Sequence, residues 1–307
     1  YELSGLTAAV EWKPMLDGAQ WARGPNYRAE PGALVDVYPH FHVTSGLVNL
    51  WRPGYQAGPL APRDVWVYLP PTYVENERAR LPVVYMHDGQ NLFDAALAFG
   101  GHEWRVDEAL DEGAETGAIR EAIVVGVGNT ADRIDEYTPS ADPEHTPSGH
   151  GDAYLDLLTT QLKPLVDATF RTRPGRGDTA LVGSSLGGLI SSYGGVHRPG
   201  VFGLVGALSP STWWDDTFLL GQVALVATQP APVERVYVDS GDSGPSQDDV
   251  SNTAKLAAAY AQAGYVEGET LRYVVQPGAS HSEVYWAQRL PGALAFLLGP
   301  RADSAAP

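Results

Sequence analysis

Cysteine is absent from the 307 residues. This excludes a disulfide scaffold, a thiol nucleophile and cysteine-based zinc sites. A chain without cysteine tolerates oxidising and reducing surroundings alike, so the absence leaves the compartment open. The sequence starts at Tyr1 rather than Met and shows no signal peptide. We expect a processed mature form or a trimmed segment, and we favour a secreted or periplasmic location over a cytoplasmic one.

Basic residues and long apolar runs are also scarce. The formal net charge is −17 and lysine occurs only at positions 13, 163 and 255, whereas phosphate binding needs a surplus of Lys and Arg. The best candidate for a membrane span, Leu290–Leu298, is shorter than the roughly 18–20 apolar residues required and contains Pro291. We therefore expect neither a nucleic-acid nor a membrane partner, and the oligomeric state stays open.

Seven short, mostly apolar runs are typical of strands that are buried on both faces. They are Val65–Leu69, Val83–Met86, Ile123–Val127, Thr179–Val182, Leu204–Leu208, Arg235–Val238 and Arg272–Val275. Helical spacing marks the segments Glu103–Glu112, Ala153–Ala168, Leu186–Val196, Val250–Ala263 and Glu283–Leu298. We expect Pro291 to kink or divide the last of these helices. The alternation predicts an α/β fold with a mostly parallel central sheet and helices on both faces.

The ends of the chain differ from this pattern. Residues 1–60 are rich in Trp, Pro and Gly and hold one expected strand, Phe41–Leu50. We predict an N-terminal extension over 1–60 that packs on a main domain over 61–300, followed by a flexible tail over 301–307. His40 and His42 would face the same side of the expected strand, but no third ligand is evident. No metal site and no cofactor are therefore expected.

The sharpest motif is Gly183-Ser-Ser-Leu-Gly187, which fits G-x-S-x-G with Ser185 at its centre. It follows an expected strand and opens an expected helix. A nucleophile on such a tight turn needs small neighbours, because the backbone doubles back there. The helix N-terminus would also direct backbone N–H groups toward a developing oxyanion. The alternative is a Gly/Ser turn that merely caps a helix.

A serine nucleophile needs a base, and histidine suits that role near neutral pH. Of the eight histidines only His281 follows all seven expected strands, in the loop Pro277–Ser282. That loop lies between the last strand and the last helix, at the carboxyl edge of the sheet. The chain order Ser, Asp or Glu, His is the one that this architecture uses. His281 is thus the predicted base, with an ordinary exposed loop histidine as the alternative.

The acid that orients His281 should come from the loop after the strand Arg235–Val238. Four aspartates lie in it, at positions 239, 242, 248 and 249. Asp242 lies in a Gly-Asp-Ser-Gly turn and is our first choice, followed by Asp248 or Asp249. The last two are also suited to capping the helix that begins near Val250. The spacing does not fit an EF-hand calcium loop.

The second half of an oxyanion site should follow an early strand. After Val83–Met86 comes His87-Asp-Gly-Gln-Asn91, where Gly89 lets the backbone turn its N–H groups inward. An ordinary surface turn is the alternative, because Asp-Gly is a common turn dipeptide.

The chain resembles the esterase family of α/β-hydrolases that includes enterochelin esterase-like, feruloyl esterase-like and esterase D-like enzymes. Six stretches between about residues 60 and 300 carry the resemblance, in the order and spacing of the family. They are Val67–Tyr73, Tyr85–Asp94, Asn129–Tyr137, Gly183–Gly188, Ser209–Trp214 and Gly278–His281. The first 60 residues fall outside it.

The resemblance implies the α/β-hydrolase fold and a role for several residues. Ser185 would be the nucleophile, His281 the base and Asp242 the third member, although Asp239-Ser-Gly-Asp242 departs from the commoner Gly-Thr-x-Asp form. Backbone N–H groups of Gln90 and Leu186 would bind the oxyanion. The side chains that would line the substrate cleft are Trp213, Trp214, Arg133 and Tyr137. The alternative for the two tryptophans is a role in packing. The alternative for the arginine is a role as a salt-bridge partner.

These residues predict a serine carboxylic ester hydrolase that works through an acyl-enzyme, on aromatic or short acyl esters. Three alternatives stay open. The first is acyl transfer to an alcohol, the second is peptide cleavage, and the third is a catalytically silent binding protein with the same fold.

Overall fold

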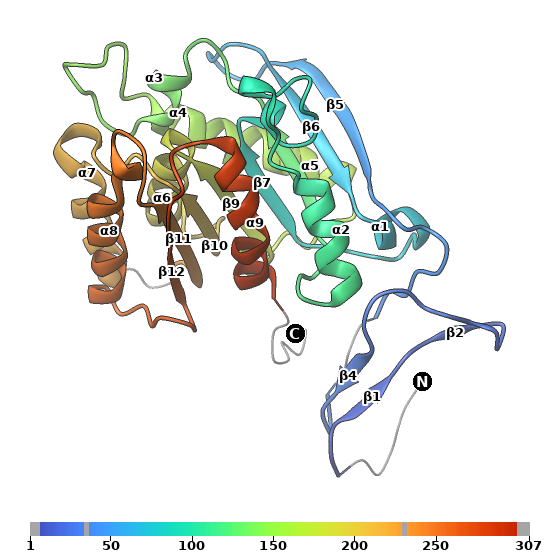
Figure 1. The fold of residues 1–307 in the computed structure, drawn as a ribbon. Helices are drawn as coiled ribbons and strands as arrows, with labels where there is room; N and C mark the ends of the chain where they lie inside the picture. Colours follow the sequence, from blue (N-terminus) through green and yellow to red (C-terminus); the bar gives the residue numbers. More distant parts are fainter. Residues whose placement is uncertain (1–6, 34–36, 229–231, 300–307) are drawn as a thin grey trace.

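An eight-stranded sheet forms the centre of the protein, which a computed structural model describes over residues 7–33, 37–228 and 232–299. The strand order is β12-β11-β10-β9-β7-β8-β6-β5 (Figure 1). The strands are β5 (Leu47–Tyr55), β6 (Arg63–Leu69), β7 (Val83–His87), β8 (Ile123–Val127), β9 (Thr179–Ser184), β10 (Leu204–Leu208), β11 (Arg235–Gly241) and β12 (Leu271–Gln276). All neighbours from β8 through β12 are parallel, and β6 and β5 join antiparallel. The predicted, mostly parallel sheet is confirmed.

Helices cover both faces of this sheet. They are α1 (Pro71–Glu75), α2 (Val106–Thr116), α3 (Arg133–Tyr137), α4 (Gly151–Asp156), α5 (Lys163–Thr169), α6 (Leu186–His197), α7 (Trp214–Val223), α8 (Val250–Gln262) and α9 (Glu283–Leu298). The buried side chains of α2 and α9 share one core with the sheet, and those of α4, α6 and α8 share the other. α9 continues through Pro291, so the expected division is wrong. The buried leucines on either side of this proline hold the helix against the sheet.

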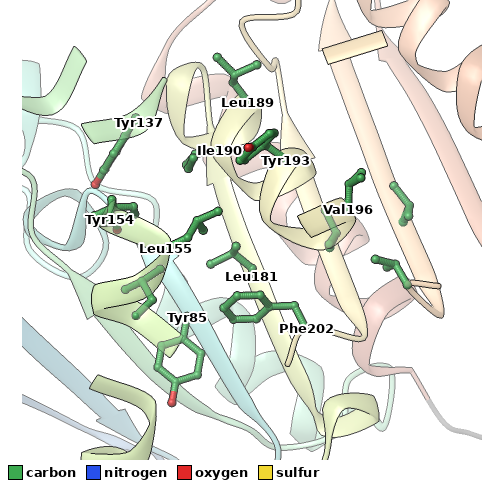
Figure 2. Close-up of a cluster of buried hydrophobic side chains, with 14 of the residues drawn as sticks. Tyr85, Tyr137, Tyr154, Leu155, Leu181, Leu189, Ile190, Tyr193, Val196 and Phe202 are labelled. Atoms are coloured by element: carbon green, nitrogen blue, oxygen red, sulfur yellow. The ribbon is translucent and has the colours of Figure 1, made fainter. Parts of the chain in front are cut away.

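The second of these cores fixes the position of α6. Leu181 of β9 lies beneath Ile190 and Tyr193 of α6, and Tyr85 of β7 packs against Phe202 in the same core (Figure 2). A Cβ added at Gly194 would lie 2.8 Å from a leucine methyl group of β9. The small residues of α6 therefore let the helix approach the sheet closely, and its first turn lies directly above the end of β9.

The N-terminal part forms two small antiparallel pairs that lie apart from the main sheet (Figure 1). They are β1 (Val10–Trp12) with β4 (Tyr27–Ala29), and β2 (Met15–Leu16) with β3 (Gln20–Trp21). The strand expected over Phe41–Leu50 is displaced to β5, an edge strand of the main sheet. The predicted boundary near residue 60 is therefore too late, because residues 47–55 already belong to the main sheet.

Residues 37–46 connect the extension to the main domain and contain no strand. The carboxylate of Glu75 in α1 accepts hydrogen bonds from the backbone N–H groups of Phe41, His42 and Val43, at 2.7–3.0 Å. The expected pairing of His40 and His42 on one strand is wrong, and His40 Nδ1 lies 2.9 Å from Thr72 Oγ1 instead.

Three further expectations concern the chain as a whole. The described residues contain no group of three His, Cys, Asp or Glu side chains placed to hold a metal ion. Among the helices of the described ranges, none is long and apolar enough to cross a membrane. The tail predicted over 301–307 lies outside the described residues.

Candidate active site

Ser185 lies on the turn between β9 and α6 with an unusual backbone. Its φ is 57° and its ψ is −124°, a conformation that costs energy for a residue with a Cβ. Close packing holds it: a Cβ at Gly183 would lie 2.6 Å from His87 Cδ2, and a Cβ at Gly187 would lie 3.3 Å from His87 Cβ. The predicted strand–turn–helix setting is confirmed, and its glycines are needed for close approach to β7.

The connection from Ser185 to His281 runs through the end of β10. The Ser185 N–H donates to the carbonyl of Leu208 at 3.0 Å. The next residue, Ser209, donates from Oγ to Asp248 at 2.6 Å, and Asp248 Oδ1 lies 2.6 Å from His281 Nδ1. Ser185 Oγ lies 3.3 Å from Ser211 Oγ, and within the described residues no hydrogen bond joins it to His281.

The structure corrects the acidic partner of His281. Asp248, in the short helical turn between β11 and α8, bonds the imidazole, and its side chain is fully buried. Asp242, the first choice from the sequence, accepts a hydrogen bond from the Gly278 N–H at 2.7 Å. The loop after β11 folds back on itself, so that the Asp248 carboxylate also accepts from the Gly241 N–H. This path of the loop places Asp248, rather than Asp242, against His281.

The surroundings of Asp248 favour its ionised form. Burial raises the pKa of this carboxyl, but hydrogen bonds from His281, Ser209 and the Gly241 N–H outweigh burial and lower the pKa below its usual value. The imidazole of His281 meets the Trp286 ring edge to face, with centroids 4.9 Å apart. The His281 side chain is 38% exposed. A partly exposed imidazole that contacts a buried carboxylate through Nδ1 is suited to proton transfer at Nε2.

The two backbone amides predicted for the oxyanion lie at neighbouring strand ends. Leu186 is the first residue of α6, where a backbone N–H has no acceptor within the helix. Gln90 lies in a 3₁₀ turn, Gly89–Asn91, directly after β7. A Cβ added at Gly187 would lie 3.6 Å from Asp88 Oδ2, so this turn borders the first turn of α6.

Arg133, predicted to line the cleft, is engaged by Asp88. Its Nε and Nη2 atoms donate to the two Asp88 oxygens at 2.7 and 2.8 Å, and Asn129 adds a third bond. Burial disfavours ionised Asp88, but Arg133, Asn129 and His87 together outweigh burial and hold the pKa of Asp88 below its usual value. The guanidinium also lies over the ring of Tyr137, which is fully buried. Arg133 and Tyr137 thus support the turn that carries Gln90.

The two predicted cleft tryptophans have different surroundings. Trp214 is 1% exposed and donates from its indole N–H to the Ser140 carbonyl, so it is part of the core. Trp213 is 42% exposed, with its ring centroid 5.5 Å from that of His145. Of the pair, only Trp213 is exposed at the surface.

A cavity of about 310 Å³ borders Gln90. Its apolar lining comes from β5, β6 and the loop after β7: Val48, Leu50, Trp66, Phe93 and Leu97. A larger cavity of about 670 Å³ lies between the N-terminal extension and the amino ends of β7 and β8, away from Ser185. The smaller cavity borders the candidate site at Gln90, and Ser185 and His281 are not among its lining residues.

The fold and the turn at Ser185 define an α/β-hydrolase. Residues 60–297 match the family described as "Putative esterase". The chain therefore belongs to this esterase family and is an ester-hydrolysing enzyme.

Several individual proteins are similar. "Uncharacterized protein YbbA" from Bacillus subtilis is 26% identical over 248 residues, which cover 77% of this chain and 93% of that protein. A siderophore triacetylfusarinine C esterase from Aspergillus fumigatus is 29% identical over 161 residues, or 50% of this chain and 52% of that protein. The solved structure of siderophore hydrolase EstA from Aspergillus nidulans shares the fold, with a TM-score of 0.65 at 21% identity. It matches 81% of this chain and 93% of its own.

Proposed function

We propose that this esterase hydrolyses carboxylic esters in two steps through an acyl-enzyme on Ser185, with His281 as base and Asp248 as the acid that orients it. The observation that carries the proposal is the 2.6 Å contact between His281 Nδ1 and the buried carboxylate of Asp248. This contact leaves Nε2 as the ring nitrogen that exchanges a proton with Ser185.

In the first step Ser185 Oγ attacks the ester carbonyl carbon while its proton passes to His281 Nε2. The tetrahedral oxyanion accepts hydrogen bonds from the backbone N–H groups of Gln90 and Leu186. The C–O bond to the alcohol then breaks, and the alcohol leaves with the proton from His281. In the second step a water molecule, deprotonated by His281, attacks the acyl-enzyme and releases the carboxylic acid and Ser185.

We infer that the substrates are aromatic or short acyl esters. The apolar cavity beside Gln90 is large enough for one ring or a short chain. The exposed ring of Trp213 offers a surface for stacking. The relative from Aspergillus fumigatus is named for a siderophore ester, which supports testing trilactone and other siderophore esters together with simple aromatic ones.

The compartment belongs to the same proposal. A secreted or periplasmic enzyme is compatible with the complete absence of cysteine. Fractionation of the source cells, with activity measured in each fraction, tests this location.

The experiment is an ester panel from acetyl through feruloyl to trilactone substrates, run with wild type and Ser185→Ala. We expect the substitution to lower turnover by about 10³-fold or more without lowering the melting temperature. Retained turnover in Ser185→Ala would refute the mechanism. Product analysis with an added alcohol distinguishes hydrolysis from acyl transfer, since transfer yields a new ester in place of the acid.

A further inference from the structure

Ser209 lies at the centre of a buried polar cluster beneath His281. The residue follows β10, is 1% exposed and has a φ of 40°. Its backbone N–H donates to both the carbonyl and the side-chain Oδ1 of Asp239, at 2.9 and 3.1 Å. These bonds hold an otherwise unfavourable backbone and fix the direction of the hydroxyl group.

Three side chains surround the Ser209 hydroxyl, and two of them can only donate. Arg289 Nη2 donates to Ser209 Oγ at 2.7 Å, and the indole N–H of Trp286 donates to it at 2.9 Å. A serine oxygen has two lone pairs and one proton. With both lone pairs engaged, the proton has a single acceptor, Asp248 Oδ2 at 2.6 Å. The direction of the Ser209–Asp248 hydrogen bond is therefore determined.

The charges around this bond reinforce it. Arg289 Nε lies 3.0 Å from Asp239 Oδ2, and Arg289 Nη2 lies 3.7 Å from Asp248 Oδ2. One guanidinium thus lies between two fully buried carboxylates, with the Ser209 hydroxyl interposed on the side of Asp248. Because Oδ2 already accepts from Ser209 and from the Gly241 N–H, it has no role as a proton donor. Oδ1 remains directed at His281.

We propose that Ser209 is a positioning residue for ester hydrolysis: its hydroxyl holds Asp248 in one orientation, as an acceptor only, so that Asp248 Oδ1 stays aligned with His281 Nδ1. This inference rests on the proposed function, because it takes His281 as the base. When His281 receives the proton of Ser185, a fixed carboxylate stabilises the imidazolium without taking the proton from it. Trp286 serves both partners, because it donates to Ser209 and packs against the His281 ring.

The test compares kcat and KM of Ser209→Ala, Ser209→Gly, Asp248→Asn and the double variant Asp248→Asn/Ser209→Ala on p-nitrophenyl acetate. Ser192→Ala is the matched control, a fully buried serine of α6 outside this cluster. Glycine adopts the positive φ of position 209 without strain, so Ser209→Gly removes the hydroxyl and favours folding. Circular dichroism and thermal melting report the fold of each variant.

We expect both Ser209 variants to lose about tenfold or more in kcat with KM unchanged, as befits a lost hydrogen bond to a charged group. Ser192→Ala keeps wild-type kcat. On the Asp248→Asn background, Ser209→Ala adds less than about a twofold further loss, because the negative charge that Ser209 would hold against His281 is already gone.

Two results would overturn the inference while leaving the proposed function intact. One is wild-type kcat in folded Ser209→Gly beside a large loss in Asp248→Asn. The other is a full additional loss from Ser209→Ala on the Asp248→Asn background, since Ser209 would then act by another route. Wild-type turnover in Asp248→Asn would instead refute the proposed function, and the inference with it.

Discussion

Replacing Asp248 by asparagine tests the corrected site with almost no change of shape. The amide keeps an oxygen that can accept from Ser209 and Gly241, so the loop can keep its path. It removes the charge that lies 2.6 Å from His281 Nδ1. The His281 proton then loses its anionic acceptor, and the ring is free to take the other tautomer. In a serine triad this costs on the order of 10⁴-fold in kcat, or about 5 kcal/mol of transition-state stabilisation.

Asp242→Asn is the matched control, because it makes the same substitution in the same loop. Its carboxylate accepts from the Gly278 N–H, a bond that an amide oxygen also makes, so kcat should stay within about twofold of wild type. The assay is p-nitrophenyl acetate hydrolysis under single-turnover and steady-state conditions, with melting curves for both variants. An Asp242→Asn loss equal to or larger than that of Asp248→Asn would refute the assignment of the acid.

Three further predictions concern packing and charge. Gly183→Ala should destabilise the fold by about 1–3 kcal/mol and lower activity, because its methyl group would lie 2.6 Å from a histidine ring carbon. Gly175→Ala, with nothing within 4 Å, is its control, and thermal melting compares the two. Glu136→Gln should cost about 3–5 kcal/mol in urea unfolding, because it leaves the buried Arg63 guanidinium without its anion. The pKa of Asp88 is lower in the folded protein than its ordinary value. The ionised carboxylate therefore stabilises the folded state fully above the ordinary pKa, and this stabilisation is lost as pH falls through the lower pKa of the folded state. The stability difference between wild type and Asp88→Asn should therefore be constant from about pH 8 to 5 and shrink below about pH 4.

The central sheet could be predicted because its strands carry their own signal. β7 and β8 are buried along their whole length, and a strand covered on both faces reads as a continuous apolar run. The edge strand β5 is largely exposed and lacks that signal, so the strand that the sequence predicts, Phe41–Leu50, begins several residues before β5. The sequence predicts Ser185 and His281 for a different reason: each follows an expected strand, in the chain order that the architecture uses.

The aspartate that contacts His281 could not be chosen from the sequence, because the contact depends on the path of one loop. Asp242 and Asp248 lie in the same polar stretch, and both satisfy the required order of residues. The hydrogen bond from the Gly241 N–H to the Asp248 carboxylate holds the loop so that Asp248 reaches His281. No rule of residue spacing predicts this hydrogen bond. The sequence also cannot tell which of the two neighbouring tryptophans is buried, because Trp213 and Trp214 have identical side chains. The packing of α7 buries Trp214 and leaves Trp213 exposed.

The most direct test of the account is to identify the residue that forms a covalent bond with a fluorophosphonate probe. The wild-type enzyme should gain one adduct, which peptide mapping by mass spectrometry places on Ser185. Asp248→Asn should react far more slowly at the same residue, and Ser185→Ala should not react. An adduct on another residue, or an active enzyme that the probe does not label, would contradict the claim that Ser185 is the nucleophile.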